Sequence, residues 1–236
     1  MTSDSENLLV RFIVDGVEVE GAVQLSTQPA PRRFILPVLR QLTDSVVEIG
    51  THRAGENGER ISCQRGCDAC CRQMVPIAAS EAFGLAKTLQ RMETAAGHRV
   101  LQRFEEASET LDQAGISDRL RRRRELSPAE LDQLDRDYFT AQVACPFLEE
   151  GACVIHGERP LACREFLVTS DAVHCQRPDG GKVKRVEMPA KFSVALYETD
   201  RPGGWIPLIL AREFVAQNNE ESVRTGDALR EVLSRV

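Results

Sequence analysis

The sequence has no run of 18 apolar residues, no basic surplus and no internal repeat. Without a long apolar run, we expect no membrane-spanning helix. The net charge of −6 argues against a general nucleic-acid binder, which usually carries an excess of Lys and Arg. The single strong basic run, Arg121 to Arg124, is flanked by acidic residues and is interpreted as a solvated helix face. We therefore expect binding to neither nucleic acid nor membrane.

An export signal is also missing from the N-terminal residues. Met1 to Asn7 are polar and acidic, without the basic and apolar regions of a secretory signal. We therefore expect a cytoplasmic protein, in which thiols stay reduced and disulfides are rare. Eight cysteines in that compartment favour metal ligation over the four disulfides that an even number would also permit.

Motifs of common enzyme classes do not stand out. Gly180-Gly181-Lys182 lacks the rest of a P-loop and is interpreted as a turn. There is no Ser–His–Asp pattern, no paired-carboxylate motif and no glycine-rich S-adenosylmethionine loop after a strand. The residues leave open whether the protein is an enzyme.

The eight cysteines lie in two blocks, and their spacing is the strongest signal in the sequence. The first block holds Cys63, Cys67, Cys70 and Cys71, and the second holds Cys145, Cys153, Cys163 and Cys175 at intervals of 8, 10 and 12 residues. Thiolate sulfur is a soft ligand suited to zinc and to iron–sulfur clusters, which need several sulfurs at one point. All eight cysteines are therefore candidate metal ligands.

Hydrophobic patterning predicts an α+β fold that is mainly helical, with helices packed around the metal centre. Alternation over residues 8–26 about Asp15-Gly16 predicts an N-terminal β-hairpin. Apolar residues at helical spacing predict a helix from about Arg33 to Thr51, with Pro37 marking a kink or a late start. Further helices are expected after an N-cap at Ser80, over about 98–113, after the capping box at Ser127, around 192–197 and near 228–236.

The first cysteine block is predicted to be partly helical. In a helix, Cys63, Cys67 and Cys70 would share one face. Adjacent Cys70 and Cys71 point their side chains in different directions. A larger cluster, or two separate sites, would accommodate that pair better than one small ion.

The second block is predicted to contain a small hairpin. Residues 145–156 read as strand, turn and strand, which would bring Cys145 close to Cys153. After Pro160, a short helix would present Cys163.

Three segments are expected, which together form one structural unit. Residues 1–55 form a hairpin-plus-helix extension. Residues 56–180 form the cysteine-cluster metal-binding domain with a helical insert. Residues 181–236 form a mixed or helical segment packed on it.

The ordered double block resembles the YkgJ-type cysteine-cluster family, a zinc- or iron-chelating domain often labelled an Fe–S cluster protein. The matching residues, within about 60–176, are Cys63-x3-Cys67-x2-Cys70-Cys71, Cys145-Pro146-Phe147-Leu148 and Cys153-x-Ile155-His156-x2-Arg159-Pro160-x2-Cys163-Arg164. The resemblance implies that the first seven cysteines are ligands, and Cys175 is similar to a trailing family cysteine. His156 stands where the family pattern leads us to expect tyrosine. A related block in the bacterial flagellin lysine N-methylase would imply an enzyme.

The spacing by itself leaves the metal open. Eight thiolates could hold one 4Fe–4S cluster with four left over, two zinc ions with four sulfurs each, or one of each. We expect an iron–sulfur cluster, of the 4Fe–4S type, in a redox or accessory role beside an unknown protein or redox partner. The alternatives are a structural zinc-binding interaction module and a cluster-dependent enzyme related to lysine N-methylases. The Cys63, Cys67 and Cys70 spacing also matches radical S-adenosylmethionine enzymes, but the helices that follow do not fit their βα barrel.

Polar residues near the cysteines are candidates for supporting roles. His156 and His174 could ligate zinc or form hydrogen bonds with the metal ligands. Arg159 and Arg164 could donate hydrogen bonds to cluster sulfurs or form salt bridges with the glutamates next to them. Asp68 is interpreted as a turn or capping residue.

Overall fold

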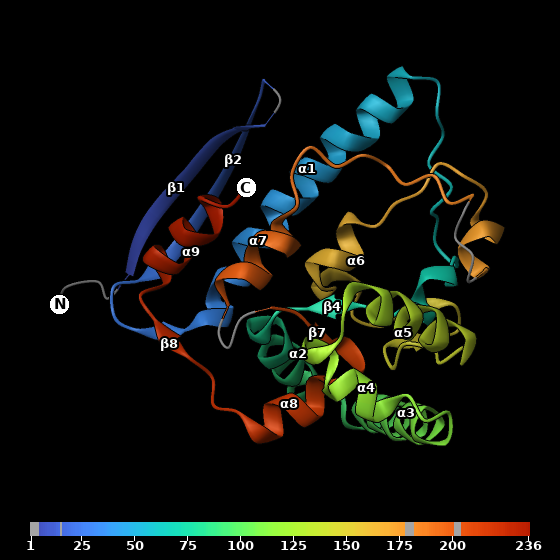
Figure 1. The fold of residues 1–236 in the computed structure, drawn as a ribbon. Coiled ribbons are helices and arrows are strands. Elements are labelled where there is room, and N and C mark those ends of the chain that lie inside the picture. The colour runs from blue at the N-terminus through green and yellow to red at the C-terminus, as the bar shows by residue number, and fades with distance from the viewer. Residues whose placement is uncertain (1–4, 15, 178–181, 201–203) are drawn as a thin grey trace.

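The computed structural model describes residues 5–14, 16–177, 182–200 and 204–236. Helices dominate the fold, and the strands form small antiparallel pairs (Figure 1). The predicted α+β class, mainly helical with an N-terminal β-hairpin, is confirmed. In the described ranges, no helix combines the length and the apolar composition that crossing a membrane requires.

The N-terminal hairpin forms where alternation predicts it. Strand β1 (Ser5–Val14) pairs with β2 (Val17–Ser26), with Val14 opposite Val17. Gly16 adopts a φ of +81°, which the tight turn requires and which glycine adopts readily. Asp15, the other predicted turn residue, lies outside the described residues.

Helix α1 (Leu36–Glu56) packs against the hairpin on one side. Pro37 lies in its first turn, so the interpretation of this proline as a late helix start is confirmed. A Cβ added at Gly21 in β2 would lie 2.8 Å from Leu42 of α1. Glycine therefore allows the strand to approach the helix closely.

Further helices follow in the middle of the chain and near its end. They are α2 (Ala79–Arg91), α3 (Thr94–Gln113), α4 (Ser117–Arg121), α5 (Pro128–Thr140), α6 (Leu161–Glu165), α7 (Phe192–Thr199), α8 (Ala211–Gln217) and α9 (Thr225–Leu233). The predicted capping box of α5 is present, because Ser127 and Glu130 bond each other's backbone N–H. The predicted N-cap at Ser80 is wrong. The N-cap is Ala78, whose backbone N–H donates to the Glu81 carboxylate, so α2 begins two residues earlier than predicted.

The remaining strands are two residues long. They pair as β3 (Ala30–Pro31) with β8 (Ser222–Val223), β4 (Pro76–Ile77) with β7 (Ile206–Pro207), and β5 (Leu148–Glu149) with β6 (Ala152–Cys153). Single 3-10 turns are η1 (Arg32–Ile35), η2 (Ala69–Arg72), η3 (Arg123–Glu125), η4 (His156–Glu158), η5 (Ala172–Gln176) and η6 (Leu208–Leu210). These short elements connect the helices.

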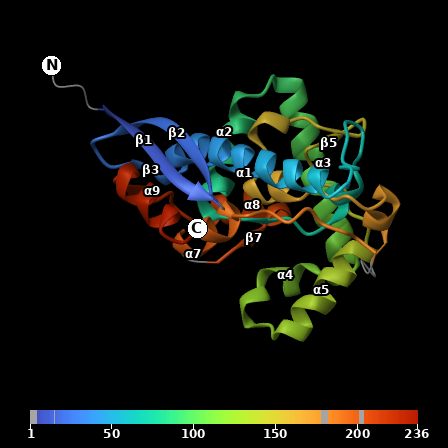
Figure 2. The ribbon, with the colours of Figure 1, turned by 90° about the horizontal axis from the view of Figure 1, so that it is seen from above.

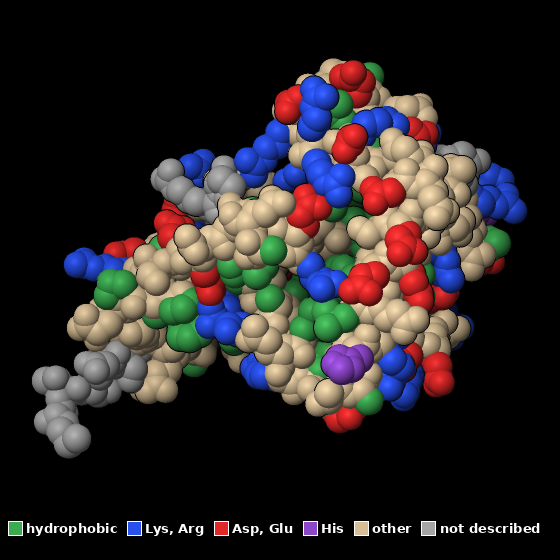
Figure 3. Space-filling model, turned by 90° about the horizontal axis from the view of Figure 1, so that it is seen from below, with side chains coloured by type: hydrophobic (Ala, Val, Ile, Leu, Met, Phe, Trp, Pro, Cys, Tyr) green, Lys and Arg blue, Asp and Glu red, His purple; other side chains and the backbone are tan. Residues whose placement is uncertain are grey.

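Two apolar cores hold the helices. The first joins the hairpin and α1 to α7 and α9 through residues such as Leu39, Phe192 and Leu229. The second joins α2, α3, α4 and α5 through residues such as Phe104 and Leu134. In Figure 2, α4 and α5 lie apart from the β1–β2 hairpin. Figure 3 shows acidic and basic side chains interspersed on one face of the molecule.

Candidate metal centre

The first cysteine block is a series of turns. From Cys63 to Asp68 the backbone is not helical, and only Ala69–Arg72 forms a 3-10 turn. Gly66 has a φ of +89°, which interrupts a right-handed helix. The prediction that three cysteines share one face of a helix is therefore wrong. Successive turns, closed by bonds such as Cys67 N–H to the Gln64 carbonyl at 3.0 Å, replace it.

The predicted hairpin of the second block is present. Leu148 lies opposite Cys153, and the turn between the strands uses left-handed residues, Glu150 and Gly151. The Leu148 N–H donates to the Cys145 carbonyl at 2.9 Å, so a second turn precedes the hairpin. Burial raises the pKa of Cys145, and the charge of the nearby Cys153 thiolate raises it further.

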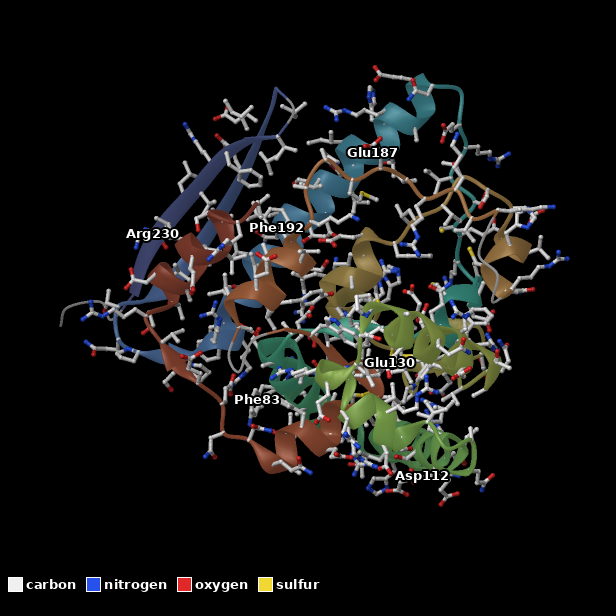
Figure 4. All side chains as sticks on the ribbon, viewed as in Figure 1. Phe83, Asp112, Glu130, Glu187, Phe192 and Arg230 are labelled. Carbon is white, nitrogen blue, oxygen red and sulfur yellow. The ribbon has the colours of Figure 1, made fainter. Side chains whose placement is uncertain are left out.

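The fold brings the two blocks together. The Cys145 N–H donates to the Cys71 carbonyl at 2.7 Å. At the hairpin turn, a Cβ on Gly151 would lie 3.6 Å from the Gly66 carbonyl oxygen. The η5 turn, which carries Cys175, packs against η2. In Figure 4, sulfur atoms are seen on the side of α6 that faces away from the β-hairpin.

The cysteines influence one another's ionisation in two groups. Burial and the neighbouring thiolates of Cys70 and Cys67 raise the pKa of Cys63, and burial and the thiolates of Cys63, Cys70 and Cys67 raise the pKa of Cys175. We name Cys63, Cys67 and Cys175 the first trio. We name Cys145, Cys153 and Cys163 the second trio, because Cys163 responds to the other two. Cys70 acts on members of both trios. Its hydrogen bond with Cys71, together with burial, raises the pKa of Cys70 well above the usual thiol range.

Burial raises the thiol pKa values most strongly in the second trio. Burial raises the pKa of Cys145 to about 12 and raises the pKa of Cys163 well above its ordinary value. Cys145 and Cys153 pack against the second apolar core, which contains the buried residues Phe147 and Ile155. Thiolates in such a setting need a nearby cation, because neither water nor other thiolates stabilise their charge.

The donor set fits a thiophilic metal, although the sulfurs are not assembled for a single ion. All eight cysteines are free thiols. Among the residues the structure describes, no group of three or more Cys, His, Asp or Glu side chains is spaced like the ligands of one metal ion.

Two arginines near the cysteines, Arg159 and Arg164, differ in their hydrogen-bond partners. Burial raises the pKa of Cys63 and Cys153, and the charge of Arg159 opposes that rise. The Arg159 Nε is buried and has no hydrogen-bond partner within the described ranges. Arg164 instead donates to both Asp44 carboxylate oxygens, at 2.6 and 2.8 Å. The predicted salt bridge of Arg164 with a neighbouring glutamate is therefore wrong, because Asp44 is its carboxylate partner.

The two histidines lie at the edges of the cysteine region. His156 is exposed at the start of η4, and the neighbouring Arg159 lowers the pKa of its imidazole. His174 precedes Cys175 in η5 and lines a cavity there. Asp68, expected to form a turn or a cap, accepts a hydrogen bond from Arg72 at 2.9 Å.

Glu81 is a supporting residue that sequence reasoning missed. Its carboxylate oxygens accept backbone N–H bonds from Ala78 and from Leu161, each at 2.8 Å. Burial raises the pKa of Glu81 to about 7. Because Leu161 begins α6, which carries Cys163, this carboxyl fixes α2 to the second trio. The position of Glu81 in the first turn of a helix predicts a capping role. Its contact with Leu161, 80 residues away, cannot be predicted from neighbouring residues in the sequence.

Comparison with known proteins identifies the family. Residues 62–185, which include all eight cysteines and more than half of the chain, match the family model "CxxCxxCC: Putative zinc- or iron-chelating domain". No curated protein and no solved structure matches the chain. The family description together with the cysteine cluster supports metal binding through cysteine sulfur. The chain belongs to the CxxCxxCC family of zinc- or iron-chelating domains.

Proposed function

We propose that this protein holds an iron–sulfur cluster through its cysteines and acts in the cytoplasm as a redox protein or as an accessory factor to a redox partner. The observation that carries the proposal is the spacing of the thiols. They gather in two trios around Cys70 and Cys71, yet no three are spaced for a single ion in the described part of the chain. A polynuclear cluster accepts ligands that lie farther apart than those of one ion.

Each trio is completed to four ligands by one residue of the Cys70–Cys71 pair. Adjacent side chains point in different directions, so one of them can serve each trio. Cys70 acts on both trios, and the Cys71 carbonyl is bonded to the Cys145 N–H, which places the pair between the two groups. All eight cysteines are then ligands in two four-sulfur sites. Full sulfur ligation favours electron transfer or a structural role over catalysis at an open position.

The second trio is the better place for an iron–sulfur cluster. A bound cluster would supply a one-electron redox centre whose potential depends on burial and on hydrogen bonds to sulfur. Phe147 and Ile155 exclude water from this side of the centre. The unpartnered Nε of Arg159 provides a donor beside Cys153. These residues would shield the cluster and tune its potential.

Structural zinc in an interaction module is the second candidate. Among the described residues, the buried cluster around the first trio consists of Ala69, Val168 and Cys175. So small a core gains little from apolar burial, and a tetrahedral zinc site could supply the missing stability. Under this proposal the protein would present a surface to a protein partner and transfer no electrons.

Anaerobic purification followed by analysis of iron, zinc and acid-labile sulfide tests the proposal. The expected result is a coloured protein with iron and sulfide in equal amounts and broad visible absorbance that bleaches on reduction. The same preparation treated with an iron chelator under oxidising conditions is the control, and it should lose the absorbance. A colourless protein with two zinc ions per chain and no iron would refute the redox proposal and establish the structural alternative.

A further inference from the structure

A cavity of about 320 Å³ lies against Cys175 of the first trio. Its walls include Phe139 of α5 and Phe166, which follows α6. Two of the residues that line it, Phe139 and Cys175, are buried. The volume is at the lower end of the range for small-molecule sites.

Three arginines line this cavity, and none of them has a carboxylate partner in the described part of the chain. Arg136 donates to the amide oxygen of Gln133 at 2.8 Å. The guanidinium carbon of Arg185 lies 4.9 Å from the centre of the Phe166 ring. The N–H of Arg177 bonds the backbone of η5, and its side chain also faces the cavity. Within the described residues, three arginines and one carboxylate, that of Asp135, line the cavity, so its lining carries an excess of positive charge.

The basic run after α4 provides a contrast. Arg121 lies 3.1 Å from Glu213, and Arg122 lies 2.7 Å from Glu125. Both are exposed, as the cavity arginines are, but each forms an ion pair with a carboxylate. In a protein with a net charge of −6, unneutralised arginines gathered around one cavity mark a site for a negative ligand.

We propose that the cavity binds a small organic anion, with its carboxylate or phosphate held by Arg136, Arg177 and Arg185 and its flat apolar part against Phe139 and Phe166. Guanidinium groups recognise such anions through paired charge-assisted hydrogen bonds, and aromatic walls favour a flat apolar body. That the anion lies beside a metal ligand rests on the proposed function, because it requires Cys175 to be a ligand. Anion binding itself does not depend on the metal.

Among the described residues that line the cavity, Asp135 is the single carboxylate. Burial raises its pKa, and the charge of Arg185 opposes that rise. An anion entering the cavity would be repelled by ionised Asp135. Replacing this residue with a neutral isostere should therefore strengthen binding.

Calorimetric titration of the full chain with benzoate tests the inference, with neutral benzamide as the matched ligand. Benzoate should bind about ten-fold or more tightly than benzamide, because only benzoate engages the arginines as an ion. Phenyl phosphate and inorganic phosphate separate the contributions of head group and ring. Equal binding of benzoate and benzamide, or no binding of any of the anions at millimolar concentrations, would overturn the proposal.

Variants locate the binding. Replacing Arg136 and Arg185 together with glutamine should weaken benzoate binding about ten-fold or more, whereas Arg122→Gln, which removes the same kind of charge elsewhere, should leave it unchanged. Asp135→Asn should tighten binding several-fold, a gain that misfolding cannot produce. If both the double variant and Asp135→Asn bind like the native chain, the cavity is not the site. Metal analysis of each sample separates the two proposals, since benzoate binding without metal would refute only the metal centre.

Discussion

The region around α1 and the region around the cysteines are held together in different ways. In the first, long elements bury residues such as Leu39, Leu42 and Phe192 completely. In the second, two-residue strands and single 3-10 turns surround eight thiols, and in the part of the chain that the structure describes the buried cluster around the first trio consists of Ala69, Val168 and Cys175. Apolar burial therefore accounts for the order of the first region.

The comparison teaches where a metal would matter. Small units that bury little apolar surface commonly depend on metal ligation for their stability. Two four-sulfur sites would link the first block, the β5–β6 hairpin, α6 and η5, which otherwise meet through a few backbone hydrogen bonds. The metal would act as the core of this region.

Metal removal should give the largest effect, and it should change the cysteine region while leaving the region around α1 intact. In hydrogen-exchange mass spectrometry, the metal-free protein should lose protection over about 62–75 and 145–177, while α1 and the hairpin keep theirs. Restoring the metal should restore protection. Uniform loss over the whole chain, or unchanged protection around the cysteines, would contradict the comparison.

The converse experiment removes apolar packing. Leu39→Ala in α1 should lower the free energy of unfolding by about 4 kcal/mol, because Leu39 is completely buried. Leu9→Ala is the matched control, since Leu9 on the hairpin is 51% exposed and its truncation should have a much smaller effect. Chemical denaturation measures both changes. Metal content per folded chain should remain that of the native protein, and its loss in Leu39→Ala would show that the two regions are not separable.

Glu81 joins α2 to α6, and its effect on stability should depend on pH. Because burial raises its pKa from 4.5 to about 7, the folded chain retains a proton there that the unfolded chain has released. The free energy of unfolding should therefore fall by up to about 3 kcal/mol as pH rises from the unfolded to the folded pKa. Glu81→Gln should lack this contribution.

Glu130 provides the control for that measurement, because it occupies the same capping position in α5. Hydrogen bonds from Ser127 lower the pKa of Glu130, so its contribution is present above the ordinary pKa and disappears as pH falls. Glu130→Gln should change the pH dependence of the free energy of unfolding weakly, and in the direction opposite to Glu81→Gln. Identical pH profiles for the native chain and Glu81→Gln would show that the buried carboxyl does not titrate as described.

Periodicity predicted the helical region well because its elements are long. Leu39 and Leu42 recur at helical spacing, and Ser127 with Glu130 gives a local capping signal, so α1 and α5 could be read directly. Pro37 likewise indicated where α1 begins. Such signals depend only on neighbours in the sequence.

The cysteine region was less predictable because its geometry depends on distant contacts. Gly66 adopts a left-handed conformation that breaks the expected helix, and the residue type alone did not reveal this. Two hydrogen bonds join segments far apart in the chain. The Cys145 N–H donates to the Cys71 carbonyl, and the Leu161 N–H donates to the Glu81 carboxylate. The sequence identified the thiols as candidates, whereas their division into two trios required the fold.

Metal content of single-cysteine variants tests the two-site account most directly. Cys67→Ser removes a member of the first trio, Cys153→Ser removes one of the second, and Val154→Ser, at an exposed neighbour, is the control. The account predicts that each cysteine variant loses the metal of one site and keeps that of the other, while the control keeps both. Complete loss of metal in both variants would show a single shared centre, and full retention in both would show that these cysteines are not ligands.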